Sequence, residues 1–292
     1  MSGFMSSTTA MKVFEAQAKE PDSDKLRKYA FTPTPGPDGK RVGWVGLGDP
    51  LDLDFSFGID FGRLLAFSLR IDERKPSSAA IKIRLAEAIK EEVAAGDGKI
   101  SGKRKKELKE AITATVTSKA DFIPSLTDCI WDLGAQRLYV STASEGALAI
   151  LLELFNKTFG VTPAPVSPKA DMAALFARAF RENIPVDGTD VSANGYSVTL
   201  ATPEQQENKA HVVVVNNQGA VATALEEGLR ITKMALLAVN GEQELAFALA
   251  DDLTISGLKL PKGEKGDDAD ATFLLKAEAC AHVAYVVEAM SK

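Results

Sequence analysis

Cysteine and histidine are both scarce in this chain, which has only two of each among its 292 residues. Cys129 and Cys280 lie far apart within apolar stretches, so we expect buried, reduced thiols rather than a disulfide. His211 and His282 have no cysteine at the spacing of zinc ligands. The sequence therefore predicts no metal site, and nothing in it indicates another cofactor.

Long hydrophobic runs are also missing. No segment approaches the roughly 18 consecutive apolar residues that a transmembrane helix requires. The N-terminal segment lacks the charged start and apolar core of a secretory signal. Hydrophobic residues make up 45% of the chain and charged residues 25%, which is ordinary for a globular protein. We therefore expect a cytoplasmic protein with no membrane partner.

Catalytic signatures are the third absence. The sequence contains no phosphate-binding GxxxxGK[ST] loop, no GxSxG nucleophile motif and no HExxH zinc motif. Gly46-Leu47-Gly48 lacks the third glycine of a dinucleotide-binding loop. Carboxylates do gather in places, as a two-metal nuclease would require, although adjacent acids in loops are more commonly solvated turns. These groups are Asp52, Asp54 and Asp60; Asp251 and Asp252; and Asp267, Asp268 and Asp270. We predict no catalytic residue and no enzyme.

Positive charge is what the sequence has in excess, at one place. The net charge is -6, yet residues 74–119 contain twelve basic and six acidic side chains, so the rest of the chain carries -12. Net charge bears on partners rather than on fold. This run is therefore either a solvated helix end or a phosphate-binding element. Its densest part contains Lys99, Lys103, Arg104, Lys105, Lys106 and Lys109, beside the single acid Glu107.

The basic run lies in a predicted pair of helices. Serine caps favour helices over about 77–95 and 101–117, and Gly96-Asp97-Gly98 interrupts them. A short glycine-rich connection predicts an antiparallel hairpin, which we expect to protrude as an arm over residues 76–119. The apolar positions of the first helix then pack on a second copy of the chain or on the second helix of the same hairpin. These positions are Ile81, Leu85, Ala88 and Ile89, facing Leu108, Ile112 and Val116 in the second case.

The rest of the pattern predicts an α+β fold of mixed or antiparallel sheets with flanking helices. Strand candidates are separated by tight turns rather than by the regular helical crossovers of a parallel sheet. The proline-rich stretch 161–170 predicts a boundary between an N-terminal α+β region, residues 1–162, and a C-terminal α+β domain, residues 163–292.

Two further candidate positions lie outside the basic run. A helix predicted over about 221–239 would place Arg230 and Lys233 together, and Arg230 then either pairs with Glu226 or contacts a phosphate. Phe122 directly follows the arm and either fills the core or offers a stacking or wedging surface to nucleic acid.

Several short segments between Ala30 and Asp270 are informative through their order along the chain and the spacing between them. They are Ala30-Phe31-Thr32-Pro33, Gly43-Trp44-Val45, the charged helices of 77–118, Phe122 ahead of Trp131-Asp132, Phe159-Gly160, Glu226, Gly228, Thr232-Lys233-Met234-Ala235-Leu236 and Asp268-Ala269-Asp270. Together they resemble the RdgC family of bacterial recombination-associated DNA-binding proteins.

The resemblance implies a homodimer closed into a ring, with duplex DNA held without sequence preference in a positively lined hole. It implies association with the nucleoid and functional competition with RecA. Phe122 matches the aromatic that the family places beside DNA. Asn217 and Gln218 match a Lys-Gln pair in the channel, whose lysine is absent here. The predicted DNA-binding residues are Lys99, Lys103, Arg104, Lys105, Lys106, Lys109, Phe122, Asn217, Gln218, Arg230 and Lys233.

Two alternatives stay open. The family is sometimes labelled an exonuclease, which would require metal-dependent degradation of DNA. A protein-interaction module, in contrast, would have no affinity for DNA at low salt.

Overall fold

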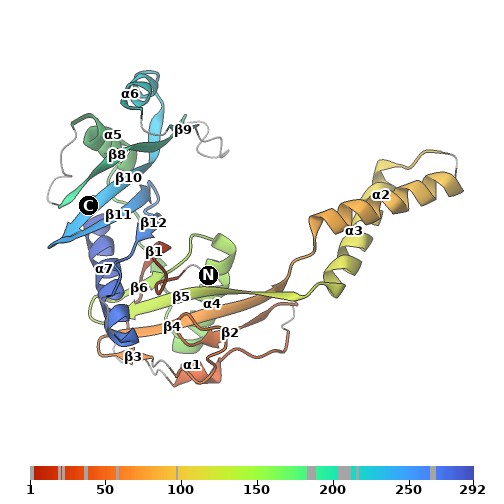
Figure 1. Cartoon of the computed structure of the whole chain (residues 1–292), viewed down its shortest axis with the longest axis horizontal. Helices are drawn as coiled ribbons and strands as arrows, with labels where there is room; N and C mark the ends of the chain where they lie inside the picture. Colours follow the sequence, from red (N-terminus) through yellow and green to blue (C-terminus); the bar gives the residue numbers. More distant parts are fainter. Residues whose placement is uncertain are drawn as a thin grey trace. The chain divides into compact units, whose positions relative to one another are not determined.

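The computed structural model describes residues 3–18, 21, 24–35, 39–56, 59–96, 98–182, 189–202, 212–214, 217–263 and 268–292. Within them the fold is α+β, as predicted, with one large antiparallel sheet and seven helices (Figure 1). The strands are β1 (Thr8–Glu15), β2 (Arg41–Val45), β3 (Asp60–Phe61), β4 (Leu64–Arg74), β5 (Phe122–Asp132), β6 (Arg137–Val140), β7 (Ala164–Pro165), β8 (Val191–Ala201), β9 (Val212–Val214), β10 (Arg230–Asn240), β11 (Gln243–Ala250) and β12 (Ile255–Lys259). Their order in the sheet is β2-β4-β5-β6-β1-β12-β11-β10-β8-β9, with β3 on β4 and β7 on β1.

The helices are α1 (Lys25–Lys28), α2 (Ser78–Ala95), α3 (Gly102–Lys119), α4 (Glu145–Phe159), α5 (Met172–Glu182), α6 (Gln218–Glu226) and α7 (Ala269–Met290). Several begin and end at the residues that the sequence indicates. The hydroxyl of Ser77 accepts a hydrogen bond from the N–H of Ala80 at the start of α2, and Ser101 does the same for Arg104 at the start of α3. Gly160 ends α4 in the left-handed conformation, with φ of +69°.

The chain divides into two compact units. Unit 1 comprises residues 1–30, 44–69 and 126–292, and unit 2 comprises residues 31–43 and 70–125. The proline-rich stretch predicted as a boundary contains β7, whose Pro165 pairs with Phe14 of β1. Residues on both sides of this stretch fall within unit 1. The division at residues 162 and 163 stays a prediction.

Aromatic rings anchor part of the core of unit 1. Trp44 meets Phe67 edge-on with ring centroids 5.0 Å apart, and Trp131 meets Phe155 of α4 at 4.8 Å. All four side chains are fully buried. Both indole N–H groups find acceptors, since Trp44 Nε1 donates to Thr158 Oγ1 at 2.8 Å and Trp131 Nε1 donates to a backbone oxygen at 2.9 Å. This cluster packs α4 against the sheet.

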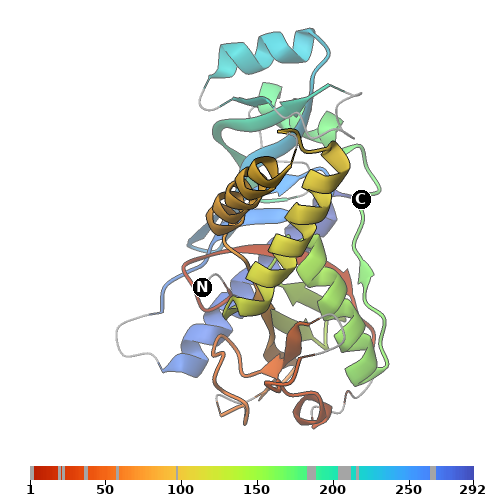
Figure 2. The same cartoon turned by 90° about the vertical axis from the view of Figure 1, so that its right-hand side faces the viewer.

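Unit 2 contains the predicted antiparallel helical hairpin, formed by α2 and α3, which lie side by side in both views (Figure 1, Figure 2). Neither helix has a fully buried residue. The apolar positions predicted to pack are half-buried, whereas Ile83 of α2 is 60% exposed. The half-buried residues are Ile81, Leu85, Ala88 and Ile89 of α2 and Leu108, Ile112 and Val116 of α3.

The helix predicted over residues 221–239 is wrong. The helix α6 ends at Glu226, Gly228 turns the chain with φ of +89°, and the strand β10 begins at Arg230. Burial along β10 alternates, with Met234, Leu236 and Ala238 inside, as a strand requires. Pairing with β8 on one side and β11 on the other fixes this segment in the sheet.

Both cysteines are free and buried, as predicted. Burial raises the pKa of the Cys129 thiol and also that of the Cys280 thiol, so both are held in the protonated form. His282 is half-buried on α7, and His211 lies outside the described residues.

Candidate nucleic-acid interface

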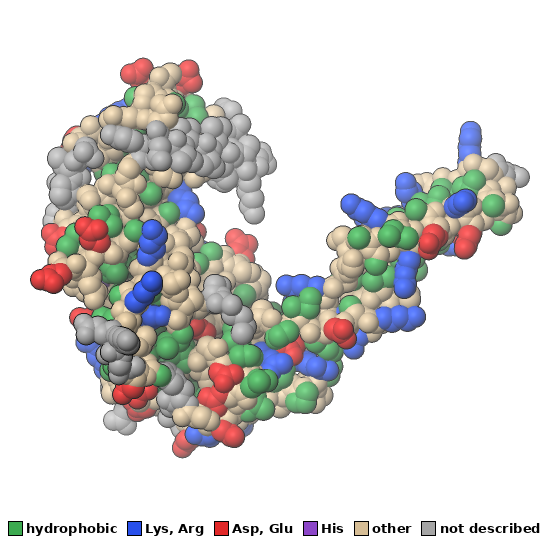
Figure 3. Space-filling view, in the orientation of Figure 1, with side chains coloured by type: hydrophobic (Ala, Val, Ile, Leu, Met, Phe, Trp, Pro, Cys, Tyr) green, Lys and Arg blue, Asp and Glu red, His purple; other side chains and the backbone are tan. Residues whose placement is uncertain are grey.

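The densest basic run lies at the connection between α2 and α3 and on the first turns of α3. All six predicted side chains are exposed there, and lysine and arginine groups project along the hairpin in Figure 3. Helical spacing of three residues places Lys103, Lys106 and Lys109 along one face of α3. The predicted position of the basic run, at the hairpin connection and the start of its second helix, is confirmed.

Arg104 differs from its neighbours because it already has acidic partners. Its Nε donates to Glu92 Oε1 at 2.8 Å, its Nη2 bonds the same oxygen, and its Nη1 lies 3.4 Å from Glu107 Oε2. The hydrogen bond to Glu92 is the main cause that raises the pKa of Arg104. This arginine therefore ties α3 to α2 and contributes less positive charge than its position suggests.

The lysines of the run are more open to a ligand. Lys106 has a loose partner, since its Nζ lies 3.9 Å from Glu110 Oε1 and both groups are exposed. Within the described part of the chain, no carboxylate oxygen lies within 4 Å of the other four ammonium groups. These four are Lys99, Lys103, Lys105 and Lys109, which we name the tip lysines. Among the described residues, no carboxylate partner offsets the charge of these four lysines.

Phe122 lies at the opposite end of α3 from the tip lysines. The helix has 18 residues, so about 27 Å separates its two ends. The ring is half-buried rather than fully enclosed. The guanidinium carbon of Arg41 lies 3.6 Å from the ring centroid, and that of Arg74 lies 4.6 Å from it. Phe122 is therefore the centre of a cation–π cluster, and neither a core residue nor an isolated stacking surface.

Asn217 and Gln218 begin α6 in unit 1, and both are exposed. The side-chain oxygen of Asn217 accepts a 3.0 Å hydrogen bond from the N–H of Ala220 and caps the helix. This cap gives Asn217 a structural role that the resemblance does not include.

Arg230 and Lys233 lie on β10 instead of a helix. Arg230 Nη2 lies 2.7 Å and 2.8 Å from the two carboxylate oxygens of Asp171, so the predicted pairing with Glu226 is wrong. A backbone hydrogen bond from Ala174 and the charge of Arg230 both lower the pKa of Asp171. Lys233 is half-buried opposite Ala250 of β11. Arg230 is therefore already neutralised, and the strand holds Lys233 partly inside.

The predicted residues divide between the two units. Unit 2 holds the basic run and Phe122, and unit 1 holds Asn217, Gln218, Arg230 and Lys233. Unit 2 has fifteen basic and ten acidic residues, a charge of +5, so unit 1 carries the remaining -11. Sequence reasoning missed Arg41 and did not single out Arg74, which meet Phe122 only through the order of the strands.

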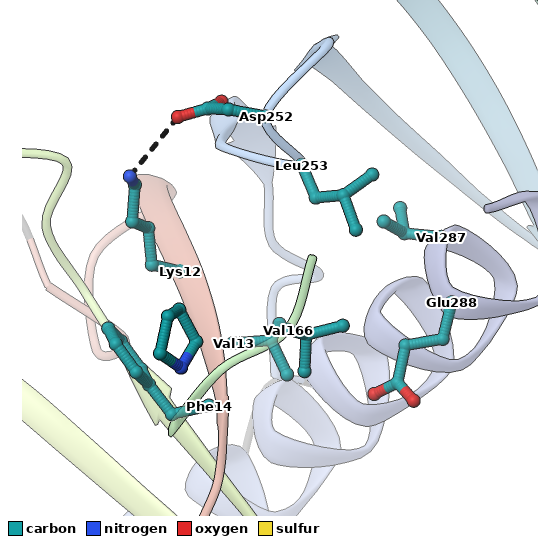
Figure 4. Close-up of a pocket in the computed structure, with 9 residues that line it drawn as sticks. Lys12, Val13, Phe14, Val166, Asp252, Leu253, Val287 and Glu288 are labelled. Atoms are coloured by element: carbon teal, nitrogen blue, oxygen red, sulfur yellow. Dashed lines mark hydrogen bonds and ion pairs between the residues drawn. The ribbon is translucent and has the colours of Figure 1, made fainter. Parts of the chain in front are cut away.

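Several of the carboxylates considered for metal binding accept hydrogen bonds from backbone N–H groups. Asp52 Oδ1 accepts from the N–H of Ser56, and Asp268 Oδ1 caps α7 through the N–H of Ala271. Asp252 lies beside a small cavity of unit 1 and pairs with Lys12 Nζ at 3.2 Å (Figure 4). Asp267 lies outside the described residues. Among the residues that the structure describes, no group of three His, Cys, Asp or Glu side chains is arranged to hold a metal ion.

No helix in the described parts of the chain combines the length and the apolar character needed to span a membrane.

The chain is similar to known proteins over nearly its whole length. Residues 11–287 match the family model described as "Putative exonuclease, RdgC". A protein of Actinobacillus pleuropneumoniae serotype 3 named Recombination-associated protein RdgC is 28% identical over 279 residues, which cover 87% of this chain and 85% of that protein. A protein of the same name from Aeromonas hydrophila subsp. hydrophila is 28% identical over 260 residues, covering 85% of this chain and 80% of that protein.

Proposed function

The chain belongs to the RdgC family, and we propose that it binds duplex DNA without sequence preference. In this proposal two copies form a ring-shaped homodimer around the duplex. The bound protein modulates RecA-dependent recombination in the bacterial cytoplasm, where it is associated with the nucleoid. The relatives named for recombination support this role.

The observation that carries the proposal is the set of tip lysines on an otherwise acidic chain. A protein that binds DNA irrespective of sequence needs cations that neutralise phosphates rather than side chains that read bases. The tip lysines have no carboxylate partner among the described residues, so each one is available for a phosphate. The charge of -11 on unit 1 repels DNA from other surfaces.

Exposed apolar side chains support the homodimer. A closed two-fold ring needs two different self-complementary interfaces on each subunit. Ile83 on α2 of unit 2 is 60% exposed, and Leu274 and Tyr285 on α7 of unit 1 are 45% and 70% exposed. The hairpin and α7 are therefore the candidates for the two interfaces.

A gel-shift with duplex DNA at low and high salt, with and without magnesium, tests the proposal. If about six phosphates are contacted, the logarithm of the binding constant falls against the logarithm of the salt concentration with a slope of roughly -5. The DNA is expected to stay intact. Magnesium-dependent loss of the DNA would identify an exonuclease, and the absence of affinity at low salt would identify a protein-interaction module.

Light scattering tests the homodimer separately. The expected mass is twice that of one chain across micromolar concentrations, whereas the mass of a single chain would exclude a stable ring.

A further inference from the structure

We propose that Arg41 and Arg74 form a phosphodiester-binding pair on the ring of Phe122. One backbone phosphate of bound DNA would then contact both guanidinium groups. This inference rests on the proposed DNA binding and adds a second backbone contact in unit 2, at the end of α3 opposite the tip lysines.

The three side chains come from three neighbouring strands. Arg41 begins β2, Arg74 ends β4 and Phe122 begins β5, and β2, β4 and β5 are adjacent in the sheet. The guanidinium carbons lie 3.6 Å and 4.6 Å from the same ring centroid. These two distances place the cationic centres within about 8 Å of each other, close enough for one anion to contact both.

Neither guanidinium has an acidic partner in the described part of the chain. Arg74 Nη1 donates to the backbone oxygen of Ser118, which carries no charge. The Nε of Arg41 is buried and has no hydrogen-bond acceptor among the described residues. Two like charges this close repel each other, and a partly buried cation without a counterion is unfavourable. A bound anion would relieve both costs.

Arg70 of the same unit is a useful comparison, because it has both an aromatic ring and a carboxylate as partners. Its guanidinium carbon lies 4.0 Å from the ring centroid of Phe31, so it also stacks on an aromatic side chain. In addition its Nε and Nη2 donate to the two oxygens of Asp72 at 2.7 Å and 2.8 Å. Among the described residues, Arg41 and Arg74 stack on a ring but have no carboxylate partner, so we assign to an anionic ligand the role that Asp72 has beside Arg70.

Phosphodiester chemistry fits this position better than another acidic ligand. A guanidinium presents a planar fork of N–H donors that matches two phosphate oxygens, and the ring restricts the orientation of both forks. The acidic neighbours along the chain are Glu73, which pairs with Lys40 Nζ at 3.1 Å, and the exposed Asp121. An aromatic ring beside the forks can also contact a sugar or a base.

Salt-dependent binding of a fluorescent DNA duplex tests the pair. We expect Arg41→Gln/Arg74→Gln to weaken binding at low salt and to flatten the salt slope by about one unit, since the pair contacts one phosphate and each lost phosphate contact accounts for about one unit. We expect Arg41→Lys/Arg74→Lys to keep most of the slope, because the charge remains, and to bind less tightly, because the planar fork is lost.

Arg70→Gln/Asp72→Asn is the matched control, since it removes a stacked arginine together with its own carboxylate. This variant should keep the wild-type slope. Circular dichroism melts of all variants report on folding, and the lysine variant keeps the test decisive if the glutamine variant unfolds.

The outcomes separate this inference from the proposed function. A wild-type protein without DNA affinity would overturn both. A wild-type protein that binds DNA, with an unchanged slope and affinity in Arg41→Gln/Arg74→Gln, would overturn the arginine pair alone.

Calorimetry with inorganic phosphate distinguishes the source of the anion. We expect no binding at concentrations that leave DNA binding intact. Tight binding of inorganic phosphate that the double variant loses, with unchanged DNA affinity, would overturn the assignment to a phosphodiester.

Discussion

The buried carboxylate of Asp128 accepts a 2.7 Å hydrogen bond from the backbone N–H of Phe4. Its second oxygen accepts a 2.6 Å hydrogen bond from the hydroxyl of Ser68. A Cβ placed on Gly3 would lie 2.2 Å from Asp128 Oδ2, so the glycine is what allows this approach. One carboxylate on β5 therefore fixes the N-terminal turn of unit 1, where Phe4 is fully buried.

Replacing Asp128 tests this connection. Asp128→Ala leaves the N–H of Phe4 and the hydroxyl of Ser68 buried without an acceptor. We expect it to lower the free energy of unfolding by about 2–4 kcal/mol, since each unsatisfied buried group costs about 1–3 kcal/mol. Urea denaturation at neutral pH measures the loss. A variant as stable as the wild type would show that the turn is held by other contacts.

The same residue predicts a pH dependence. Burial is the main cause that raises the pKa of Asp128 in the folded protein above 3.8. The folded state therefore binds this proton more tightly than the unfolded state, and the resulting stability is complete at low pH and is lost as the pH rises through the folded-state pKa. We therefore expect acidification to raise the unfolding free energy of the wild type relative to that of Asp128→Asn, because the asparagine cannot bind the proton. A constant difference across pH 4 to 7 would contradict the raised pKa.

The tip lysines and Arg104 are predicted to contribute unequally to DNA binding. We expect Lys103→Gln/Lys105→Gln/Lys109→Gln to flatten the salt slope by about three units, because three phosphate contacts are lost. Arg104→Gln should flatten it by less than one unit, since Glu92 and Glu107 already neutralise this guanidinium. Fluorescence anisotropy with duplex DNA at several salt concentrations measures both. Equal effects per residue would show that the ion pairs of Arg104 open when DNA binds.

We expect Phe122→Ala to weaken DNA binding while lowering the free energy of unfolding only modestly. Its ring is half-buried, and each cation–π contact at such a position contributes about 0.5–1 kcal/mol. Phe122→Ala should therefore lower the unfolding free energy by about 1–2 kcal/mol and weaken DNA binding with little change in the salt slope, because an aromatic ring releases no counterions.

Phe67→Ala is the matched comparison for Phe122, since Phe67 is fully buried. It should cost about 3–5 kcal/mol of stability. Thermal melts of the two variants rank them. An equal loss in both would place Phe122 in the core.

The local parts of this fold could be predicted from the sequence, and the non-local parts could not. Ser77 and Ser101 cap their helices as predicted, because a cap depends on residues within one turn. The apolar spacing of the segment after Glu226 predicts a helix, whereas the structure has a strand there. Pairing with β8 and β11 decides its structure, and those partners lie far along the sequence or across a turn.

In the candidate site, too, the local features could be predicted from the sequence and the non-local ones could not. The tip lysines lie close together in the sequence, so their charge and their place in the hairpin could be predicted directly. Arg41, Arg74 and Phe122 meet because β2, β4 and β5 are neighbours in the sheet. That order is a tertiary property, and no spacing in the sequence reports it.

Asn217 stands where the resemblance implies a lysine in the DNA channel. A lysine at this position would restore the positive charge. We expect Asn217→Lys to tighten binding of duplex DNA and to steepen the salt slope by about one unit, because one more phosphate is neutralised. The substitution also removes the hydrogen bond to the N–H of Ala220, and the lost cap should cost about 1 kcal/mol of stability. Asn217→Ala is the matched control, since it removes the same cap without adding charge. The two variants should melt at similar temperatures, and only the lysine variant should bind DNA more tightly. If both bind DNA with the wild-type slope, Asn217 lies away from the DNA and acts only as the cap of α6.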